Sequence, residues 1–202
     1  MKPKVISKEI HIPEPQINKA SVTLKGTSPL IMHEWSEKAK QSIRDKQQKK
    51  ATVKREARNP QEEYERAKIK DKDGDLAIKA IWIKNAIVDS SRFVENLPMT
   101  ILRGALFIKG DEDGLIKLRY KKEKMVEDAV KLSGIGRTSD LRYRPYIYDW
   151  EADVTIEYDG DVITMEQVIH LLKKAGFSNG IGENRPERSG DTYGRFEVQP
   201  IK

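Results

Sequence analysis

A well-marked helix near the C-terminal end, with a strand signal on either side, constrains the fold of this chain more than any other feature. Thr164 and Gln167 form the pattern of a capping box that opens a helix, and Gly176 marks its end. Between them the apolar residues recur at helical spacing, at Val168, Leu171, Leu172 and Ala175. Residues 150–158 and 193–198 alternate as strands do. The C-terminal part therefore predicts a strand, a helix and a closing strand.

The preceding residues predict further strands and helices. The predicted strands comprise residues 21–25, 76–78, 106–108, 115–118 and 141–148. The predicted helices comprise a basic one after Ser36, a short one opened by Asn59-Pro60, and one over residues 80–95. The turn at 110–114 is typical of a hairpin, and residues 121–136 are extended or helical. This order predicts an α+β fold, a ferredoxin-like β-α-β-β-α-β antiparallel sheet with a basic helical insertion.

The domain organisation follows from the placement of these signals. We expect an N-terminal tail over residues 1–18 and a single domain over 19–199, with an insertion over 36–75. A chain of 202 residues is long enough to build a core without staples, and the absence of cysteine excludes a disulfide scaffold and a thiolate metal site. The apolar runs are far shorter than the roughly 20 residues that span a bilayer, so we expect a cytoplasmic protein without membrane contact.

Positive charge is concentrated in one segment. The chain has a net charge of +6, and residues 37–58 contain nine lysines and arginines against three acidic residues. Concentrated charge favours a polyanionic partner, because cations that displace counterions from phosphates bind without regard to sequence. The alternative is a solvated helix. The candidate contacts in and beside this segment are Trp35, Lys38, Arg44, Lys49, Lys50 and Arg55.

The connection between the C-terminal helix and the closing strand is unusually long and rich in glycine and arginine. We call residues 180–194 the glycine loop, which contains four glycines in a stretch that compact domains make in a few residues. Glycine lets the backbone approach a ligand, and Arg185, Arg188 and the adjacent Arg195 could hold phosphate oxygens. The alternative is a surface loop in which these arginines pair with Glu183, Glu187 and Asp191. The loop matches neither a dinucleotide-binding fingerprint nor a P-loop.

Two further arginine positions are candidates for phosphate contact. Arg142 and Arg144 alternate with Tyr143 and Tyr146, a pattern that combines cations with aromatic rings on which bases could stack. Arg137 follows the smaller glycine pair Gly134 and Gly136. These residues add a second set of nucleic-acid contacts to the prediction.

The glycine loop resembles the G-loop of the RAMP superfamily, whose members form the backbone of CRISPR effector complexes or process their guide RNA. Residues 28–33, 142–145 and 180–186 also resemble a family of small bacteriophage and prophage proteins, over most of the chain from Ala20 to Val198. The resemblance implies an RRM-like or RAMP-like sheet, assembly along a single strand, and a thumb-like role for the basic insertion.

Together these observations predict a non-enzymatic protein that binds single-stranded RNA or DNA and assembles along it as a homo-oligomer or filament, in the cytoplasm of a bacterial host. No cofactor and no metal are expected, because His11, His33 and His170 are far apart in sequence. Two alternatives stay open. One is a metal-independent endoribonuclease with His33 as general base, and the other is a phage-encoded protein that interferes with a host RAMP assembly.

Overall fold

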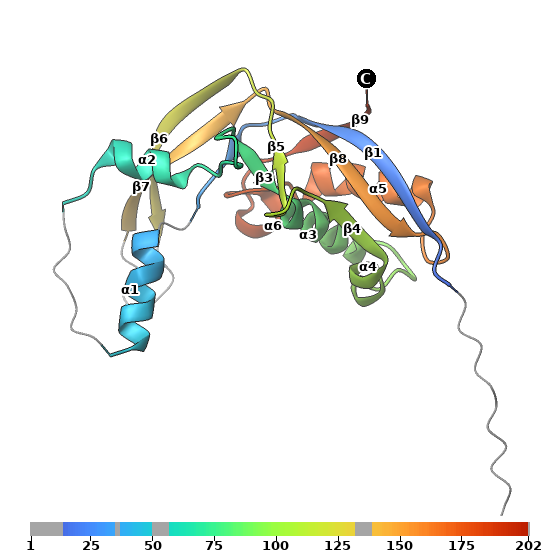
Figure 1. The fold of residues 1–202 in the computed structure, drawn as a ribbon. Helices are drawn as coiled ribbons and strands as arrows, with labels where there is room; N and C mark the ends of the chain where they lie inside the picture. The colour runs from blue at the N-terminus through green and yellow to red at the C-terminus, as the bar shows by residue number, and fades with distance from the viewer. Residues whose placement is uncertain (1–13, 35–36, 50–56, 132–138, 202) are drawn as a thin grey trace, which may run out of the picture.

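The computed structural model describes residues 14–34, 37–49, 57–131 and 139–201, without the side chains of residues 37–39, 46 and 131. In Figure 1 these residues form an arch. One part of the arch is a body, in which helices cover a sheet, and the other is an arm that extends from the body. No described helix is long and apolar enough to cross a membrane.

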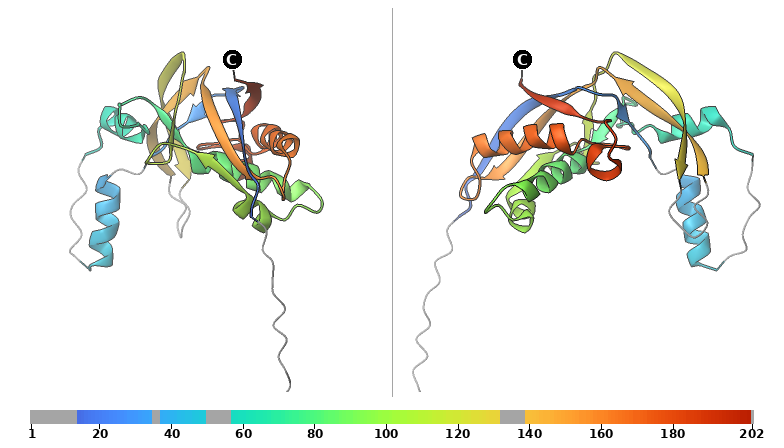
Figure 2. Two further views of the ribbon diagram at one scale, coloured as in Figure 1. Left: turned by 45° about the vertical axis from the view of Figure 1, so that its right-hand side comes forward. Right: turned by 180° about the vertical axis from the view of Figure 1, so that it is seen from behind.

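The sheet of the body has four antiparallel strands in the order β4-β8-β1-β9. Their bounds are β1 Ile17–Gly26, β4 Leu106–Lys109, β8 Glu151–Asp159 and β9 Phe196–Pro200. Two helices, α3 (Ala80–Ser90) and α5 (Met165–Ser178), pack against each other on one face of this sheet (Figures 1 and 2). In sequence α3 lies between β1 and β4, and α5 lies between β8 and β9, so each helix connects two strands of the sheet that it covers.

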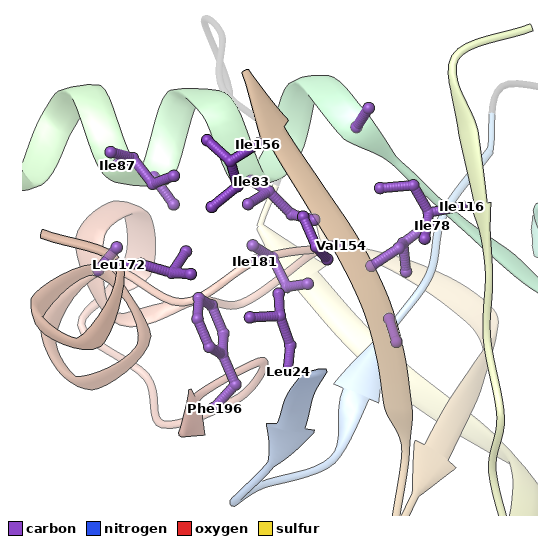
Figure 3. Close-up of a cluster of buried hydrophobic side chains, with 14 of the residues drawn as sticks. Leu24, Ile78, Ile83, Ile87, Ile116, Val154, Ile156, Leu172, Ile181 and Phe196 are labelled. Atoms are coloured by element: carbon purple, nitrogen blue, oxygen red, sulfur yellow. The ribbon is translucent and has the colours of Figure 1, made fainter. Parts of the chain in front are cut away.

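The core lies between this sheet and its two helices (Figure 3). Alternate residues of β1 and β8 point into it, and so does one face of each helix. Fully buried side chains from these four elements include Leu24, Val154, Ile156, Ile83, Ile87 and Leu172. Each contributes about 1.5–3 kcal/mol by leaving water, so this layer holds the body together.

The arm is a ribbon of β6 (Lys122–Lys131) and β7 (Ser139–Tyr148), which pair antiparallel along their whole length. The short β2 (Leu30–Ile31) pairs with the other edge of β7, and α2 (Pro60–Ala67) packs on β7. Helix α1 (Glu37–Gln47) lies near the far end of the arm (Figure 1). The remaining elements are β3 (Ala77–Lys79), η1 (Ser91–Phe93), α4 (Met99–Ala105), β5 (Leu115–Lys117) and α6 (Pro186–Ser189).

Two helix starts that were predicted from capping residues are confirmed, and the third predicted cap, Ser36, lies outside the described residues. The Asn59 side chain accepts hydrogen bonds from the backbone N–H groups of Gln61 and Glu62 at the start of α2. At the start of α5, Thr164 and Gln167 form the reciprocal capping box. Each cap satisfies backbone donors that a helix leaves free at its first turn, which is why local sequence was sufficient to find both starts.

The predicted hairpin of residues 106–108 and 115–118 is wrong. The turn itself forms, because the Asp111 carboxylate accepts hydrogen bonds from the N–H groups of Asp113 and Leu115. Beyond the turn the two strands separate: β4 pairs with β8 in the body, and β5 pairs with β3 in a small second sheet. The predicted turn is therefore confirmed. The strands on either side of it pair with other strands, β8 and β3, instead of with each other.

Two element boundaries also differ from expectation, and one stretch that the sequence left open is assigned. The helix predicted over residues 80–95 ends at Ser90, where the Ser90 and Ser91 hydroxyls donate to the carbonyls of Ile87 and Val88 and compete with continued helix formation. The ambiguous stretch 121–136 contains strand β6, which pairs along all of β7. The first strand begins at Ile17 instead of residue 21, because its pairing with β8 extends to Asp159.

Candidate nucleic-acid interface

The glycine loop is hydrogen-bonded near both of its ends to the segment Pro29 to Ile31, which follows β1 and includes β2. The Gly194 N–H donates to the carbonyl of Pro29 (2.8 Å), and the Glu183 N–H donates to the carbonyl of Ile31 (3.0 Å). The loop also closes on itself, since the Ile181 N–H donates to the carbonyl of Gly194 (2.9 Å). The loop therefore has a defined conformation that brings its arginines to fixed positions between the body and the arm.

Two glycines of the loop are required by the protein's own backbone. Gly182 and Gly194 have φ angles of +78° and +67°, a region that side chains rarely adopt. A Cβ on Gly182 would lie 2.6 Å from the carbonyl oxygen of Ile31, and one on Gly194 would overlap the carbonyl oxygen of Ile181. The glycine-rich pattern predicted close approach of a ligand, but neighbouring backbone occupies the space at Gly182 and Gly194.

The loop arginines differ in how far they are already engaged. Arg185 donates to the carbonyl of Gly182 (3.1 Å) and pairs with Glu187 (3.2 Å), as the surface-loop alternative predicted. Arg188 lies exposed on α6 and has no ion-pair partner among the described residues. Arg195 donates through Nε to the carbonyl of Phe177 (3.1 Å). Arg188 is therefore the loop cation most open to an outside phosphate.

Arg144, a candidate phosphate contact, lies instead in a buried ion-pair cluster. Its side chain is fully buried, and Nε and Nη2 donate to the Asp128 carboxylate (2.9 and 2.7 Å) across the two strands of the arm. The Tyr146 hydroxyl donates to the same carboxylate (3.0 Å), and Glu183 of the glycine loop lies 3.7 Å from Arg144 Nη1. A cation enclosed in this way stabilises the junction of arm and loop and does not face solvent.

The two aromatic candidates near Arg144, Tyr146 and Tyr143, also differ in how far they are buried. Tyr146 is buried, packs edge-to-face on Tyr193 with 5.3 Å between ring centroids, and has a raised pKa because of burial and its bond to Asp128. Tyr143 is half-buried on the arm beside Arg142, whose guanidinium lies 3.7 Å from Asp140. Arg142 and Tyr143 are thus the members of this group that the fold leaves in partial contact with solvent.

His33 lies beside this cluster, with its Nδ1 buried and without a hydrogen-bond partner among the described residues. Burial lowers the pKa of the imidazole, and the positive charge of Arg142 lowers it further. The imidazole is therefore held in its neutral form at neutral pH. The endoribonuclease alternative, which assigns His33 the role of general base, stays a prediction.

The lowered pKa of His33 predicts a pH-dependent stability. Above pH 6.5 the imidazole is neutral in both the folded and the unfolded chain; as the pH falls below 6.5, the unfolded chain binds the proton first and the folded state loses stability. We expect wild type to lose more stability between pH 7.5 and pH 5.5 than His33→Gln, measured by urea unfolding. The variant His170→Gln, at an exposed position of α5, controls for loss of an imidazole. Equal losses in wild type and His33→Gln would contradict the assignment.

The basic segment is described only in part. Arg44 and Lys49 are exposed at and just beyond α1. Lys38 lies in α1 without a described side chain, and Trp35, Lys50, Arg55 and Arg137 fall outside the described residues. In Figures 1 and 2, α1 and α6 both lie on the lower side of the arch as drawn. The fold therefore brings α1 and α6, which contain Arg44 and Arg188 and are remote in sequence, to the same side of the molecule.

Two exposed aromatic residues were not predicted. Phe93 follows α3, and Phe177 lies in the last turn of α5, where Arg195 stacks on its ring. The sequence contained a signal for Phe177: at 100° per residue it lies opposite Val168, on the helix face away from the core. A phenylalanine on the polar side of an amphipathic helix is an exposed apolar residue that packing does not explain.

Comparisons with known proteins show which solved structures this fold is similar to. No protein-family model matches the sequence, and no curated protein matches it. A chain in the cryo-EM structure of the Type III-B Cmr-beta bound to cognate target RNA matches with a TM-score of 0.56 and 11% identity, over 92% of this chain and 60% of that chain. This chain thus spans about three fifths of that neighbour's length. The crystal structure of Cmr6 from Pyrococcus furiosus matches with a TM-score of 0.43 and 12% identity, over 91% of this chain and 99% of that chain.

The match to the Cmr-beta chain shows that the two chains share a fold with antiparallel sheets and both helices and strands. A likeness of this kind is what the resemblance of the glycine loop to the RAMP superfamily predicted. The bacteriophage and prophage resemblance, the domain boundaries and the individual contact residues stay predictions.

Proposed function

We propose that this chain is a non-enzymatic RAMP-like module that binds single-stranded nucleic acid, RNA in particular. Helix α6 of the glycine loop and helix α1 near the far end of the arm lie on one side of the arch, and each carries an exposed arginine, Arg188 and Arg44; this observation carries the proposal. Cations spaced along one side can follow a phosphate backbone. The similar Cmr-beta structure holds target RNA, which favours RNA over DNA.

The strand order supports a ferredoxin-like body within this proposal. In a β-α-β-β-α-β unit the two helices cover one face and the first and third strands are central. Counting only β1, β4, β8 and β9, the observed order places the first and third strands in the centre, with α3 and α5 as the two helices. On this interpretation the basic α1 and the short α2 are insertions after the first strand.

The open face of the body sheet is an unsuitable platform for bases. RRM sheets stack bases on aromatic residues of the central strands. Here the outward residues of the central pair β1 and β8 are polar: Thr23 donates to Asp153 (2.7 Å), and Lys19 pairs with Glu157 (3.1 Å). Arg119 on the same face is held by Asp153. The side of the molecule that carries α6 is therefore the better candidate surface for binding the single-stranded nucleic acid.

A salt titration of RNA binding tests the proposal. For a single strand, the logarithm of the binding constant falls with the logarithm of salt by about 0.7 per phosphate neutralised. We expect wild type to show such a slope in filter binding with unstructured RNA, and the triple variant Arg44→Gln, Lys49→Gln, Arg188→Gln to lower it by roughly 2.

The matched control removes three lysines from the outward face and edges of the body sheet: Lys19→Gln, Lys25→Gln and Lys109→Gln. It changes the net charge equally and should keep the wild-type slope. Affinity that does not change with salt would remove the electrostatic basis of the proposal. Equal slopes for the two triple variants would place the nucleic acid elsewhere. A parallel titration with DNA of the same sequence measures the preference for RNA.

We further propose that several copies assemble along one strand. Helix α6 of the glycine loop and the basic helix α1 lie on the same side of the arch, so neighbouring copies can contact successive nucleotides of one strand. The number of copies bound should then rise with RNA length, which analytical ultracentrifugation of complexes on short and long oligonucleotides would measure.

A further inference from the structure

We propose that Phe177 and Phe93, with the cations beside them, form a base-stacking subsite for the single strand on the outer side of the helical layer. This inference rests on the proposed function, because it places part of the same strand. It goes beyond that function by naming where unpaired bases, as distinct from phosphates, are held.

The two rings are unusually exposed. The relative exposure of Phe177 is 71% and that of Phe93 is 68%, the largest values among the exposed large hydrophobic residues of the described chain. Both come from elements of the helical layer, α5 and η1. Neither ring is buried in the core, so core packing does not explain why these two residues are aromatic.

Each ring has a cation beside it. The Arg195 guanidinium lies 4.8 Å from the centroid of the Phe177 ring, and Lys174 Nζ lies 5.2 Å from that of Phe93. Lys174 also donates to the carbonyl of Phe93 (3.3 Å) and lies three residues before Phe177, on the same side of α5. Lys174 of one pair and Phe177 of the other therefore lie within one turn of α5.

The subsite is continuous with the glycine loop. Arg195 directly follows Gly194, the last loop residue, and its Nε donates to the carbonyl of Phe177. Its backbone N–H donates to the Ser28 hydroxyl (2.9 Å). A strand that contacts Arg188 on α6 can therefore continue past Arg195 onto the Phe177 ring without leaving the protein surface.

The surrounding charge favours a nucleic acid over an apolar protein partner. The α5 residues near Phe177, among them His170, Lys173 and Lys174, are polar or cationic, and beside Phe93 only Val94 adds a further exposed apolar side chain among its described chain neighbours. A ring with a cation beside it matches a nucleotide: the ring accepts a base, and the cation accepts the phosphate. A second copy of this chain is the competing occupant, and the test separates it.

The test compares Phe177→Leu, Phe93→Leu and the double variant with wild type. Leucine keeps an apolar side chain but removes the aromatic face, and both positions are exposed, so folding should be unaffected. Binding is measured against a single-stranded oligonucleotide and against one of equal length and charge with abasic sites throughout. The control is Phe107→Leu, on the opposite edge strand β4: Phe107 is also exposed and has Lys84 Nζ 3.8 Å from its ring centroid.

We expect wild type and Phe107→Leu to prefer the oligonucleotide with bases, and each subsite variant to lose about tenfold of that preference, the lower part of the range for one stacked base. Affinity for the abasic strand should not change. If the preference survives in the double variant while wild type still binds with a salt-dependent affinity, the subsite is wrong and the proposed function stands. If wild type binds neither oligonucleotide, the proposed function itself is wrong.

A sedimentation measurement without nucleic acid tests the second-copy alternative. We expect the same monomeric mass for wild type and the double variant. A wild-type dimer that the double variant abolishes would assign the two rings to self-association and overturn the base-stacking proposal.

Discussion

Replacing Arg144 with methionine is expected to lower the free energy of unfolding by about 3–5 kcal/mol, the effect of removing one partner from a buried ion pair. The Arg144 side chain is fully buried, and its two bonds to Asp128 join β7 to β6. Without the guanidinium, the partly buried carboxylates of Asp128 and Glu183 lose the cation that lies within ion-pair distance of both. Urea unfolding of wild type and variant measures the difference.

Arg142→Met is the matched control, because it removes the same side chain two residues away. Arg142 is partly exposed and its acidic neighbour Asp140 lies at 3.7 Å, so the expected loss is at most about 1 kcal/mol. If the two variants lost equal stability, burial would not be the cause of the effect. Adding Asp128→Asn to each variant gives a double-mutant cycle, and we expect a larger coupling with Arg144, which donates two hydrogen bonds to Asp128, than with Arg142, which lies opposite Asp128 in the strand register.

Replacing Gly194 with alanine is expected to cost roughly 3 kcal/mol. One part is the left-handed conformation at φ +67°, which costs a residue with a Cβ about 1–2 kcal/mol. The other part is overlap between that Cβ and the carbonyl oxygen of Ile181, which forces the loop backbone to move. Because the moved segment carries Arg188 and Arg195, RNA affinity should fall together with stability.

Gly190→Ala separates the two contributions. Gly190 has a similar φ of +73°, but nothing lies within 4 Å of a Cβ built there. Its expected cost is therefore the conformational part alone, about 1–2 kcal/mol, with RNA affinity close to that of wild type. Equal losses at positions 190 and 194 would contradict the close packing of Gly194 against Ile181. Denaturant unfolding and filter binding on the same samples supply both readouts.

Some structural features of this protein depend only on residues close together in the sequence. The capping residues of α2 and α5, the alternation of β1, β7 and β8, and the turn at Asp111 act within a few residues of themselves, so each was visible in the sequence. The glycine loop was recognisable because a long connection rich in glycine is rare in compact domains. The local features predicted an α+β fold, and the resemblance of the glycine loop to the G-loop of the RAMP superfamily added the RAMP-like fold.

The candidate site depended on contacts between distant segments. Arg142 and Arg144 look equivalent in sequence, yet the carboxylates of Asp128 and Glu183 enclose only the second. Gly182 and Gly194 look like ligand-binding glycines, yet their space is filled by Ile31 and Ile181. The partner of each residue lies in another element, and no local pattern encodes which elements meet.

Where helices start, which residues alternate and where the chain turns could be derived from the order of amino acids, because capping bonds, periodicity and backbone conformation act over a few residues. Which cations remain open to a phosphate, which glycines serve packing, and that Phe177 meets Arg195 became known only from the folded chain. Burial and pairing are relations between surfaces that come together when the sheet closes on its helices, and for that reason they are properties of the tertiary structure.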